Sequence, residues 1–369
     1  MLIRPSKDFQ EKRAVIKVIG VGGAGGNAVN RMVQAGLQGV EFIAANTDAQ
    51  ALKGSLAEIR VQLGETLTKG LGVGGDPAKG RDSTIESEDT IREYLAGADM
   101  VFITAGMGGG TGTGGAPVVA RVAKELDALT IGVVTKPFEF EGVTKASIAE
   151  NGATEMRQNV DTLLQIPNQR LFEVIDNRTP LDEAFRLADD VLRKAIQSIS
   201  DIITFPGNIN MDLNDIRAVM KDAGEALIGM AEESGQGRAL KAAKSAVESP
   251  LLENVVIDGA KGLVVNVTGR KDSLMTVEVE DAMRYIKDTA SSDARIKLGT
   301  AYDDSLGEKI RITVIATGFP ARRRRFPGHR GIDLSHANVP PDARSLVATA
   351  TAEELSKPAF MRLKVRKLR

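Results

Sequence analysis

Two glycine-rich segments, each placed between a short apolar run and a helix-like segment, constrain this chain most. Gly20 to Asn27 follows the β-branched run 14–21, and Gly106 to Gly115 follows the run 100–104. A glycine-rich turn from a buried strand into a helix is typical of parallel sheets whose faces are covered by helices. Because the carboxyl ends of parallel strands share one edge of a sheet, we expect both glycine segments to lie there.

Apolar and polar segments alternate on either side of these turns. We expect strands at 14–21, 40–45, 100–104 and 129–135, and helices at 27–35, 86–95 and 117–126. Residues 64–82 are rich in glycine and polar side chains, which predicts a loop with at most a short helix. Alternating strands and helices of this length indicate an α/β fold, with a parallel sheet and right-handed crossovers.

A long amphipathic helix is expected over residues 179–203. Thr179 can cap this helix, and Pro180 suits its first turn. Apolar side chains recur at helical spacing on one face: Leu181, Ala184, Phe185, Ala188, Val191, Leu192, Ala195, Ile196 and Ile199. At 1.5 Å per residue the helix spans about 35 Å, which is long enough to connect two domains.

The pattern changes after this helix. We expect helical segments at 214–232 and 236–249, and strands at 262–268, 274–279 and 310–317. These predict a smaller α+β unit without glycine-rich turns at its strand ends. From residue 321 onward arginine, proline, glycine and serine dominate with little periodicity, which predicts a disordered linker.

The residue types present exclude several chemistries. The chain has no cysteine, and its only histidines are His329 and His336 in the expected linker. Thiolate nucleophiles, iron–sulfur clusters and cysteine zinc sites are therefore impossible, and histidine catalysis in the body is not expected. Any chemistry must use carboxylates, amides, hydroxyls, backbone N–H groups or a bound cofactor.

Charge is distributed unevenly along the chain. Residues 321–369 carry a net charge of +8, and the first 320 residues carry −9. An acidic body disfavours nucleic acid as a partner, whereas the basic tail suits an anionic membrane surface or an acidic protein. No apolar run approaches the roughly 18–20 residues that span a bilayer, and the charged N-terminus does not match a signal peptide. We therefore expect a cytoplasmic protein without direct membrane insertion.

The two glycine segments predict a phosphate site. Read alone, the first contains the GxGxxG pattern of dinucleotide folds, a weak signal that also fits a tight turn without a ligand. The second segment adds further backbone donors and the hydroxyls of Thr111 and Thr113, which together suit a di- or triphosphate. Neither segment contains the lysine of a P-loop, and the body has no kinase catalytic loop.

Several separated motifs resemble the FtsZ family, the bacterial relatives of tubulin. GGGTGTG at 108–114 is similar to the tubulin signature, and GVGGAGGNAVN at 20–30, NTDAQAL at 46–52, KPFEFEG at 136–142 and NINMDLNDIR at 208–217 occur in the family's order. The resemblance covers about residues 12–320. It implies a tubulin-like fold and a GTPase that polymerises head to tail into protofilaments.

The resemblance also implies which residues bind GTP and GDP. The phosphates would contact Gly22, Gly23, Ala24, Gly25, Gly26, Asn27, Gly109, Gly110, Thr111, Gly112, Thr113 and Gly114. Asn46 and Asp48 would lie on the metal side, with Mg²⁺ held mainly through the phosphates and K⁺ as a further candidate cation. Glu141 resembles the ribose contact, and Lys145 stands where many relatives carry arginine. Phe185 would stack on the guanine, and Asp189 would accept hydrogen bonds from its edge.

The segment from Asn210 to Asp215 forms a third constellation. Asp212 and Asp215 are three residues apart at an expected helix start, so both carboxylates can project from one face. Helix capping alone would account for this pattern. The resemblance implies instead that Asn210, Asp212 and Asp215 enter the nucleotide site of the next subunit and orient the attacking water there.

The C-terminal end resembles the family's tail peptide in Pro358, Phe360 and Arg362. Such a peptide folds on binding to membrane tethers and division regulators. Lys357 stands where the family has an acidic residue, so the identity of these partners stays open. The other implied partner is a second copy of the chain.

Taken together, the sequence predicts a Rossmann-like GTPase domain, a long central helix, a smaller α+β domain and a disordered C-terminal tail. The expected segments are a flexible N-terminus (1–13), the GTP-binding domain (14–178), the central helix (179–203), the α+β domain with the acidic loop (204–320), the linker (321–352) and the partner-binding peptide (353–369). The resemblance implies GTP hydrolysis in a filament that forms the cytokinetic ring beneath the inner membrane. Two alternatives stay open: an NAD-dependent oxidoreductase, and a structural homologue that does not hydrolyse GTP.

Overall fold

The computed structural model describes residues 14–173, 178–204, 208–209, 211–249 and 257–319. The expected segments 1–13, 321–352 and 353–369 lie outside these residues, as do Asn210, Pro358, Phe360 and Arg362. All described residues belong to one compact unit of the chain.

A single sheet of ten strands runs through the described residues in the order β3-β2-β1-β4-β5-β6-β7-β10-β8-β9. The first six in this order are parallel: β3 (Ile59–Gln62), β2 (Glu41–Asn46), β1 (Ile16–Val21), β4 (Met100–Gly106), β5 (Leu129–Lys136) and β6 (Thr162–Pro167). β6 pairs in parallel with β7 (Gly224–Ser234) only over Thr162–Leu164. Beyond it, β10 (Lys309–Thr317) is antiparallel to both β7 and β8 (Gly262–Gly269), and β9 (Arg295–Tyr302) is parallel to β8.

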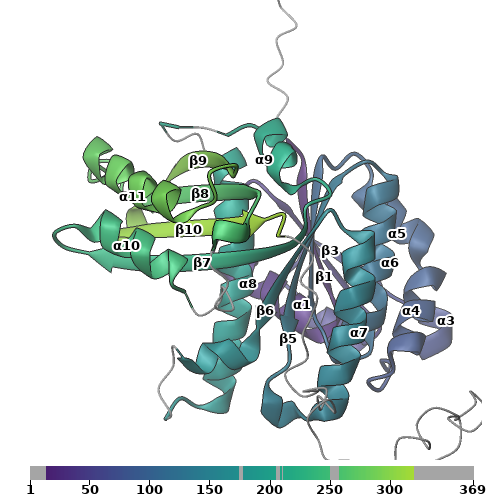
Figure 1. Cartoon of the computed structure of the whole chain (residues 1–369). Helices are drawn as coiled ribbons and strands as arrows, with labels where there is room; N and C mark the ends of the chain where they lie inside the picture. Colours follow the sequence, from purple (N-terminus) through teal and green to yellow (C-terminus); the bar gives the residue numbers. More distant parts are fainter. Residues whose placement is uncertain (1–13, 174–177, 205–207, 210, 250–256, 320–369) are drawn as a thin grey trace, which may run out of the picture. The chain divides into compact units, whose positions relative to one another are not determined.

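Helices cover both faces of the parallel strands (Figure 1). One face carries α1 (Gly22–Gln34) and α8 (Leu181–Thr204), and the other carries α5 (Glu88–Leu95), α6 (Thr111–Glu125) and α7 (Val143–Asn159). The neighbours Phe102 and Ile103 of β4 are both fully buried, the first in the cluster with Leu192 of α8 and the second in the cluster with Val119 of α6. Because strand side chains alternate, the parallel strands are a buried middle layer, as the sequence predicted.

The remaining helices are shorter or lie over the antiparallel strands. They are α2 (Ala49–Lys53), α3 (Glu65–Thr68), α4 (Pro77–Glu86), α9 (Leu213–Met220), α10 (Arg238–Val247) and α11 (Thr276–Thr289). Single-turn 3₁₀ helices occur at Glu139–Glu141, Ile257–Gly259 and Asp304–Leu306, and a longer one at Asn168–Glu173. α10 and α11 share a buried cluster with one face of β7, β8 and β10.

Helix α8 packs against both groups of strands. Its buried side chains share one cluster with Val133 of β5, Ile228 of β7 and Val264 of β8. The apolar face does not lie wholly in the core: Leu181 is 59% exposed, and Phe185, which we expect to contact a base, is 38% exposed. The first turn of α8 therefore leaves the core, and the carbonyl of Pro180 accepts the first helical hydrogen bonds.

Several expected elements differ in the structure. The helix expected over 214–232 ends at Met220, and β7 follows from Gly224, whose φ of +74° ends the turn. Ala226, Leu227 and Ile228 are buried in β7 because pairing with β6 and β10 overrides their helix propensity. The strand expected at 274–279 is the loop and first turn of α11.

Other differences concern where elements begin and end, and elements that the sequence pattern did not predict. The glycine turns belong to the helices, since α1 begins at Gly22 and α6 at Thr111, which places Pro117 inside α6. Residues 64–82 contain α3 and most of the first two turns of α4, which is more helix than expected. The sequence pattern missed α2, α7, β3, β6 and β9.

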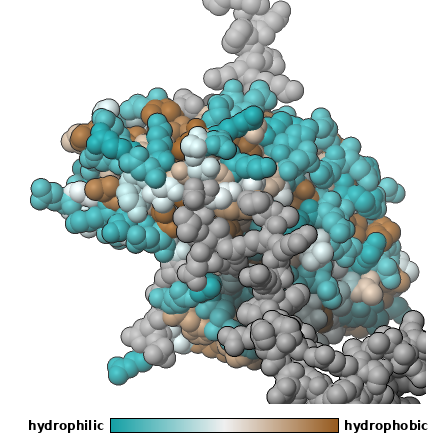
Figure 2. All heavy atoms as spheres, in the orientation of Figure 1, coloured by the Kyte–Doolittle hydropathy of each residue, from teal (hydrophilic) through white to brown (hydrophobic). Residues whose placement is uncertain are grey.

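Among the helices that the structure describes, none has the length and apolar character needed to cross a bilayer. The longest, α8, has 24 residues and carries charged side chains such as Asp190 and Arg193. The face shown in Figure 2 is mainly hydrophilic, with apolar side chains in small groups.

Candidate nucleotide-binding site

A pocket of about 440 Å³ opens at the carboxyl ends of β1, β4 and β5. Both glycine segments line it, together with residues from the loops after β2 and α3 and from the first turns of α8. A Cβ built on Gly22 would lie 2.8 Å from the backbone nitrogen of Gly112, so the two segments are in direct backbone contact. The prediction that both segments meet at one sheet edge is confirmed.

Two helix N-termini face this pocket. α1 begins at Gly22 and α6 at Thr111, and neither has a side-chain cap or an acidic residue in its first turn. The first N–H groups of a helix lack intrahelical acceptors and carry partial positive charge, so uncapped N-termini attract anions. Two of them at one pocket suit a ligand with several phosphate groups.

The second glycine segment is held in place by threonine hydroxyls. The hydroxyl oxygens of Thr111 and Thr47, which follows β2, lie 2.7 Å apart. The N–H of Gly108 donates to Oγ1 of buried Thr113 over 2.9 Å, and the N–H of Met107 donates to the carbonyl of Thr135 over 2.9 Å. These bonds give the segment a fixed shape.

Glu141, in the 3₁₀ helix before α7, and Lys145, in the first turn of α7, line one end of the pocket. Oε1 of Glu141 accepts from the N–H of Phe138 over 2.9 Å, and Oε2 accepts from Nζ of Lys145 over 3.2 Å. The Glu141 side chain is 16% exposed and that of Lys145 is 53% exposed. The carboxylate is therefore oriented by two donors, while the lysine ammonium stays largely in solvent.

An aromatic group marks the same end of the pocket. The ring of Phe185 on α8 meets the ring of buried Phe138 edge-on, with centroids 5.3 Å apart. Phe140 and Phe172 also contact Phe138, and both are exposed. Phe185 thus presents an open ring surface to the pocket, which suits a planar base.

Asp189 lies one helical turn after Phe185 and also lines the pocket. Its Oδ2 accepts from Nε of Arg31 on α1 over 3.0 Å, and its side chain is 13% exposed. Burial raises the pKa of Asp189, and the hydrogen bond and charge of Arg31 oppose that rise. Arg31 therefore favours an ionised carboxylate, which can accept hydrogen bonds at both oxygens.

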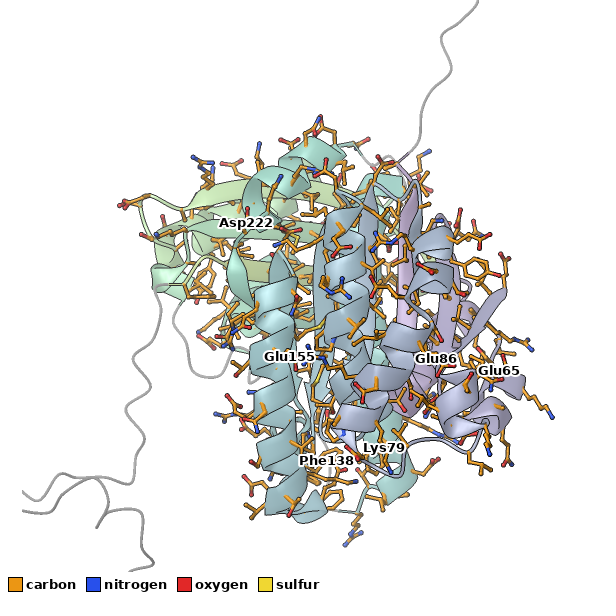
Figure 3. All side chains as sticks on the ribbon, turned by 90° about the vertical axis from the view of Figure 1, so that its right-hand side faces the viewer. Glu65, Lys79, Glu86, Phe138, Glu155 and Asp222 are labelled. Carbon is orange, nitrogen blue, oxygen red and sulfur yellow. The ribbon has the colours of Figure 1, made fainter. Side chains whose placement is uncertain are left out.

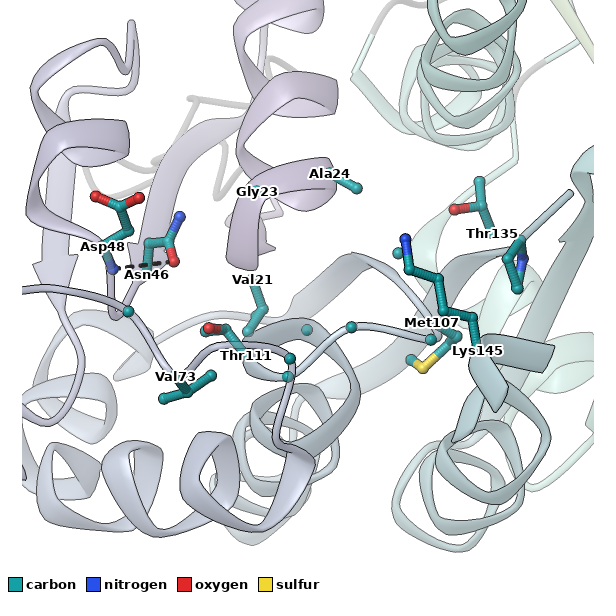
Figure 4. Close-up of a pocket in the computed structure, with 18 of the residues that line it drawn as sticks. Val21, Gly23, Ala24, Asn46, Asp48, Val73, Met107, Thr111, Thr135 and Lys145 are labelled. Atoms are coloured by element: carbon teal, nitrogen blue, oxygen red, sulfur yellow. Dashed lines mark hydrogen bonds between the residues drawn. The ribbon is translucent and has the colours of Figure 1, made fainter. Parts of the chain in front are cut away.

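Asn46 and Asp48 lie at the opposite side of the pocket from Lys145 (Figure 4). The N–H of Asp48 donates to Oδ1 of Asn46 over 3.3 Å, and Oδ1 of Asp48 caps α2. The described residues contain no group of three acidic or histidine side chains that could hold a metal ion. The side chains of Asn46 and Asp48 fit an Mg²⁺ ion that takes most of its ligands from phosphates and water.

The structure also brings residues to the pocket that the sequence analysis did not single out. Leu71 to Gly75 form one wall, and Asn168, which follows β6, also lines the pocket. Asn168 is 5% exposed, and its Oδ1 has no hydrogen-bond partner among the described residues. The glycines at 72, 74 and 75 could have indicated the wall, whereas nothing in the sequence marks Asn168.

Not every predicted phosphate residue lines the pocket. Gly23, Ala24, Gly109, Gly110, Thr111 and Gly112 do. Gly22, Gly25, Thr113 and Gly114 are buried in the first turns of α1 and α6, whereas Gly26 is half-buried and Asn27 is exposed on α1. A Cβ on Gly114 would lie 2.0 Å from the carbonyl oxygen of Pro77, so this glycine allows α4 to pack closely against α6.

The acidic loop lies at the other edge of the sheet. Arg217 of α9 donates to the carbonyl of Asp99, which precedes β4, over 3.4 Å, and Thr162 at the start of β6 donates to the carbonyl of Met220. Both contacts are at strand amino ends, whereas the pocket is at the carboxyl ends. In Figure 3, Phe138 and Asp222, which follows α9, lie near opposite ends of the view. Asp212 and Asp215 therefore cannot reach the pocket of their own chain.

Comparisons with known proteins agree with this architecture. A family model for the GTPase domain of the tubulin/FtsZ family matches residues 15–176, and one for the C-terminal domain of the FtsZ family matches residues 224–320. The chain is similar to the empty FtsZ dimer of M. jannaschii, with 41% identity over 84% of this chain and 89% of that chain and a TM-score of 0.81. It also shares its fold with CetZ2 of Haloferax volcanii in a GTPγS-bound protofilament, with 22% identity over 84% of this chain and 95% of that chain and a TM-score of 0.70.

Proposed function

The chain belongs to the tubulin/FtsZ family of GTPases, and from that premise we propose that it hydrolyses GTP in a site shared between two copies. One copy holds the nucleotide in the pocket at the carboxyl ends of the strands. The next copy supplies Asp212 and Asp215. The observation that carries this proposal is the separation of the pocket and the acidic loop to opposite edges of one sheet.

In the pocket, we assign the phosphates to the N-termini of α1 and α6 and to the backbone of Gly109 to Gly112. Phe185 stacks on the guanine, and Asp189 accepts from its N1–H and exocyclic amine. Glu141 bonds the ribose. Mg²⁺ bound with the nucleotide would be held mainly by phosphate oxygens near Asp48 and would neutralise charge that develops on them.

In the reaction, an oxygen of water forms a bond to the γ-phosphorus, and the bond from that phosphorus to the β–γ bridging oxygen breaks. GDP leaves with the bridging oxygen, and the water proton passes to the phosphate and solvent. Asp212 and Asp215 orient the water by accepting its O–H groups, and the backbone donors of the pocket stabilise the equatorial oxygens. Asn210, outside the described residues, stays a predicted third member of this loop.

A site divided in this way can repeat along a row of copies. Each contact between two copies buries one nucleotide, and the row keeps an unused pocket at one end and an unused acidic loop at the other, to which further copies can bind. We therefore propose a head-to-tail protofilament that forms the ring at the division site beneath the inner membrane. The similar FtsZ of M. jannaschii forms a dimer, which supports self-association of this chain. Tethering through the segment with Pro358, Phe360 and Arg362 also remains a proposal.

The oxidoreductase alternative is not favoured, because a tubulin/FtsZ GTPase model matches residues 15–176 and an FtsZ C-terminal model matches residues 224–320. A homologue without turnover differs from the proposed function only at the acidic loop. Asp212 and Asp215 are both present and project from the start of α9, which supports hydrolysis.

Mixing two inactive variants tests the shared site. Asp212→Ala retains the pocket, and Gly109→Asp places a carboxylate where the phosphates would bind, in open space in the structure. Each alone should release phosphate at a small fraction of the wild-type rate. An equimolar mixture should recover activity well above the sum of the two, because the pocket of one variant meets the acids of the other. If the mixture stays at the sum, the site is not shared.

A further inference from the structure

The ammonium group of Lys297, on the edge strand β9, contacts the acidic loop. Its Nζ donates to Oδ1 of Asp215 over 2.6 Å, and the two side chains are 38% and 35% exposed. Ion pairs this exposed contribute little to folding. The effect of this pair on the direction of the carboxylate is therefore more important than its effect on stability.

Strand β9 supports the whole loop, not only Asp215. The N–H of Thr300 donates to the carbonyl of Ile209, and the N–H of Ile209 donates to Oγ1 of Thr300, both over 3.0 Å. A Cβ on Gly299 would lie 3.1 Å from Cε of Met211, which is 4% exposed. The loop is thus docked on β9 on both sides of the unplaced residue 210, so Lys297 projects from a fixed position.

The two acids of the loop are oriented by different donors. Oδ1 of Asp212 accepts from the N–H of Asp215 over 2.8 Å and caps α9. Oδ1 of Asp215 accepts from Lys297, and this contact holds the pKa of Asp215 below its usual range. The backbone N–H of Asp212 also donates to the Asp215 carboxylate. Each carboxylate is therefore held by a named donor, and its remaining lone pairs can accept from a water.

We propose that Lys297 is a positioning residue for GTP turnover, which fixes the Asp215 carboxylate so that it faces the water in the next copy's site. This inference rests on the proposed function, because it requires that Asp215 acts across the contact between copies. Without the ammonium, the carboxylate can rotate about χ1 and χ2 and is repelled by Asp212 and by the triphosphate. Misplacement of a group that orients a reactant slows the chemical step more than it weakens docking.

Three lysine variants test the role. Lys297→Met removes the charge and keeps the length, Lys297→Arg keeps a cation, and Lys241→Met changes an exposed lysine of α10 as a control. The measurements are phosphate release at saturating GTP and the amount of chain sedimented as polymer. Lys297→Met should lower the rate per polymerised chain by about 10- to 100-fold with the polymer fraction unchanged. Lys297→Arg should recover most of the rate, and Lys241→Met should match the wild type.

Three results would overturn the proposal: a wild-type rate in Lys297→Met, a fall explained fully by lost polymer, or no recovery in Lys297→Arg. Asp215→Asn, measured in parallel, separates this inference from the proposed function. If Asp215→Asn is slow and Lys297→Met is normal, only the role of Lys297 is wrong. If Asp215→Asn itself turns over normally, the shared site is wrong. In the Asp215→Asn background, Lys297→Met should have no further effect, because it acts through the missing carboxylate.

Discussion

Nε of Arg31 on α1 lies 3.0 Å from Oδ2 of Asp189 on α8, although 158 positions separate the two residues in the chain. The pair joins the helix whose N-terminus faces the phosphate end of the pocket to the helix that carries the proposed guanine contacts. It leaves Oδ1 of Asp189 without a hydrogen bond from any described residue. The arginine therefore leaves a free acceptor on a residue that lines the pocket.

Replacing Arg31 should weaken GTP binding and change its pH dependence. Burial raises the pKa of Asp189 and Arg31 opposes the rise, so Arg31→Met should raise this pKa further. A protonated carboxyl accepts fewer hydrogen bonds, so GTP affinity should fall on acidification, and in the variant the fall should begin at a higher pH. We expect about tenfold weaker binding by calorimetry near neutral pH. Arg284→Met, which removes an exposed ion pair with Glu280 on α11, is the control. If Arg31→Met and the wild type had equal affinity and equal pH profiles, this role for Arg31 would be excluded.

Asp189 should make the chain bind GTP more tightly than inosine triphosphate, which lacks the exocyclic amine. The wild-type chain should bind GTP about tenfold or more tightly, because a charge-assisted hydrogen bond contributes about 1.5–3 kcal/mol. Asp189→Ala should lose most of this preference and bind both nucleotides weakly. Competition against a fluorescent nucleotide measures the ratio. A preference that survives in Asp189→Ala would show that another group reads the amine.

Asp212 should be needed for turnover beyond its role as a helix cap. Asn caps helices about as well as Asp, whereas Ala costs about 1 kcal/mol at such a position. Asp212→Asn and Asp212→Ala should therefore both lose phosphate release and keep GTP binding, and only Asp212→Ala should unfold at lower temperature. If Asp212→Asn were fully active, capping alone would explain this residue.

Asp201, in the last turns of α8, should make the fold more stable as the pH falls. Burial is the largest cause that raises its pKa from 3.8 to about 6, and nearby Asp303 adds to it. The folded chain thus takes up the proton as the pH falls through about 6, and the unfolded chain only near 3.8, so stability rises between these values. At pH 7.5, Asp201→Asn should be more stable by up to about 3 kcal/mol.

This gain should vanish below about pH 4, where both states carry the proton. Chemical unfolding from pH 4 to 8 tests the prediction, with Asp272→Asn on an exposed aspartate as control. A gain that does not change with pH would have another cause, such as altered packing.

Arg238 should stabilise the antiparallel part of the sheet. Its guanidinium bonds both carboxylate oxygens of Glu278 on α11, at 2.7 and 3.0 Å, and the carbonyls of Ser273 and Glu308. Its side chain is 8% exposed. Arg238→Met leaves Glu278 partly buried without its cation, so we expect a loss of about 3–5 kcal/mol in thermal unfolding. Arg284→Met, whose pair with Glu280 is exposed, should cost less than about 1 kcal/mol.

The sequence predicted the parts of the fold that depend on local patterns. Short β-branched runs before glycine segments predicted two parallel strands with both turns at one edge, and the structure pairs these strands, β1 and β4, as neighbours. Such patterns fail where partners far along the chain decide the structure. Residues 224–234 form a strand because β6 and β10 pair with them, and their own composition favours a helix.

The site was predictable where a local pattern or the resemblance to the family marked it. The glycine segments were indicated by their own composition, and Glu141, Phe185 and Asp189 by the resemblance; residues of all of these line the pocket. Arg31, Asn168 and Lys297 belong to no such motif. Arg31 and Lys297 act through partners 158 and 82 positions away, and proximity of that kind exists only after folding.

The placement of pocket and acids at opposite edges gives any row of such copies two unlike tips. On the proposed function, the pocket of the outermost copy at one tip has no neighbour to insert acids, so its triphosphate survives however old the polymer is. At the other tip the unused acids face solvent and do nothing. Each filament would therefore keep one unhydrolysed GTP at the same end, which distinguishes its two ends chemically.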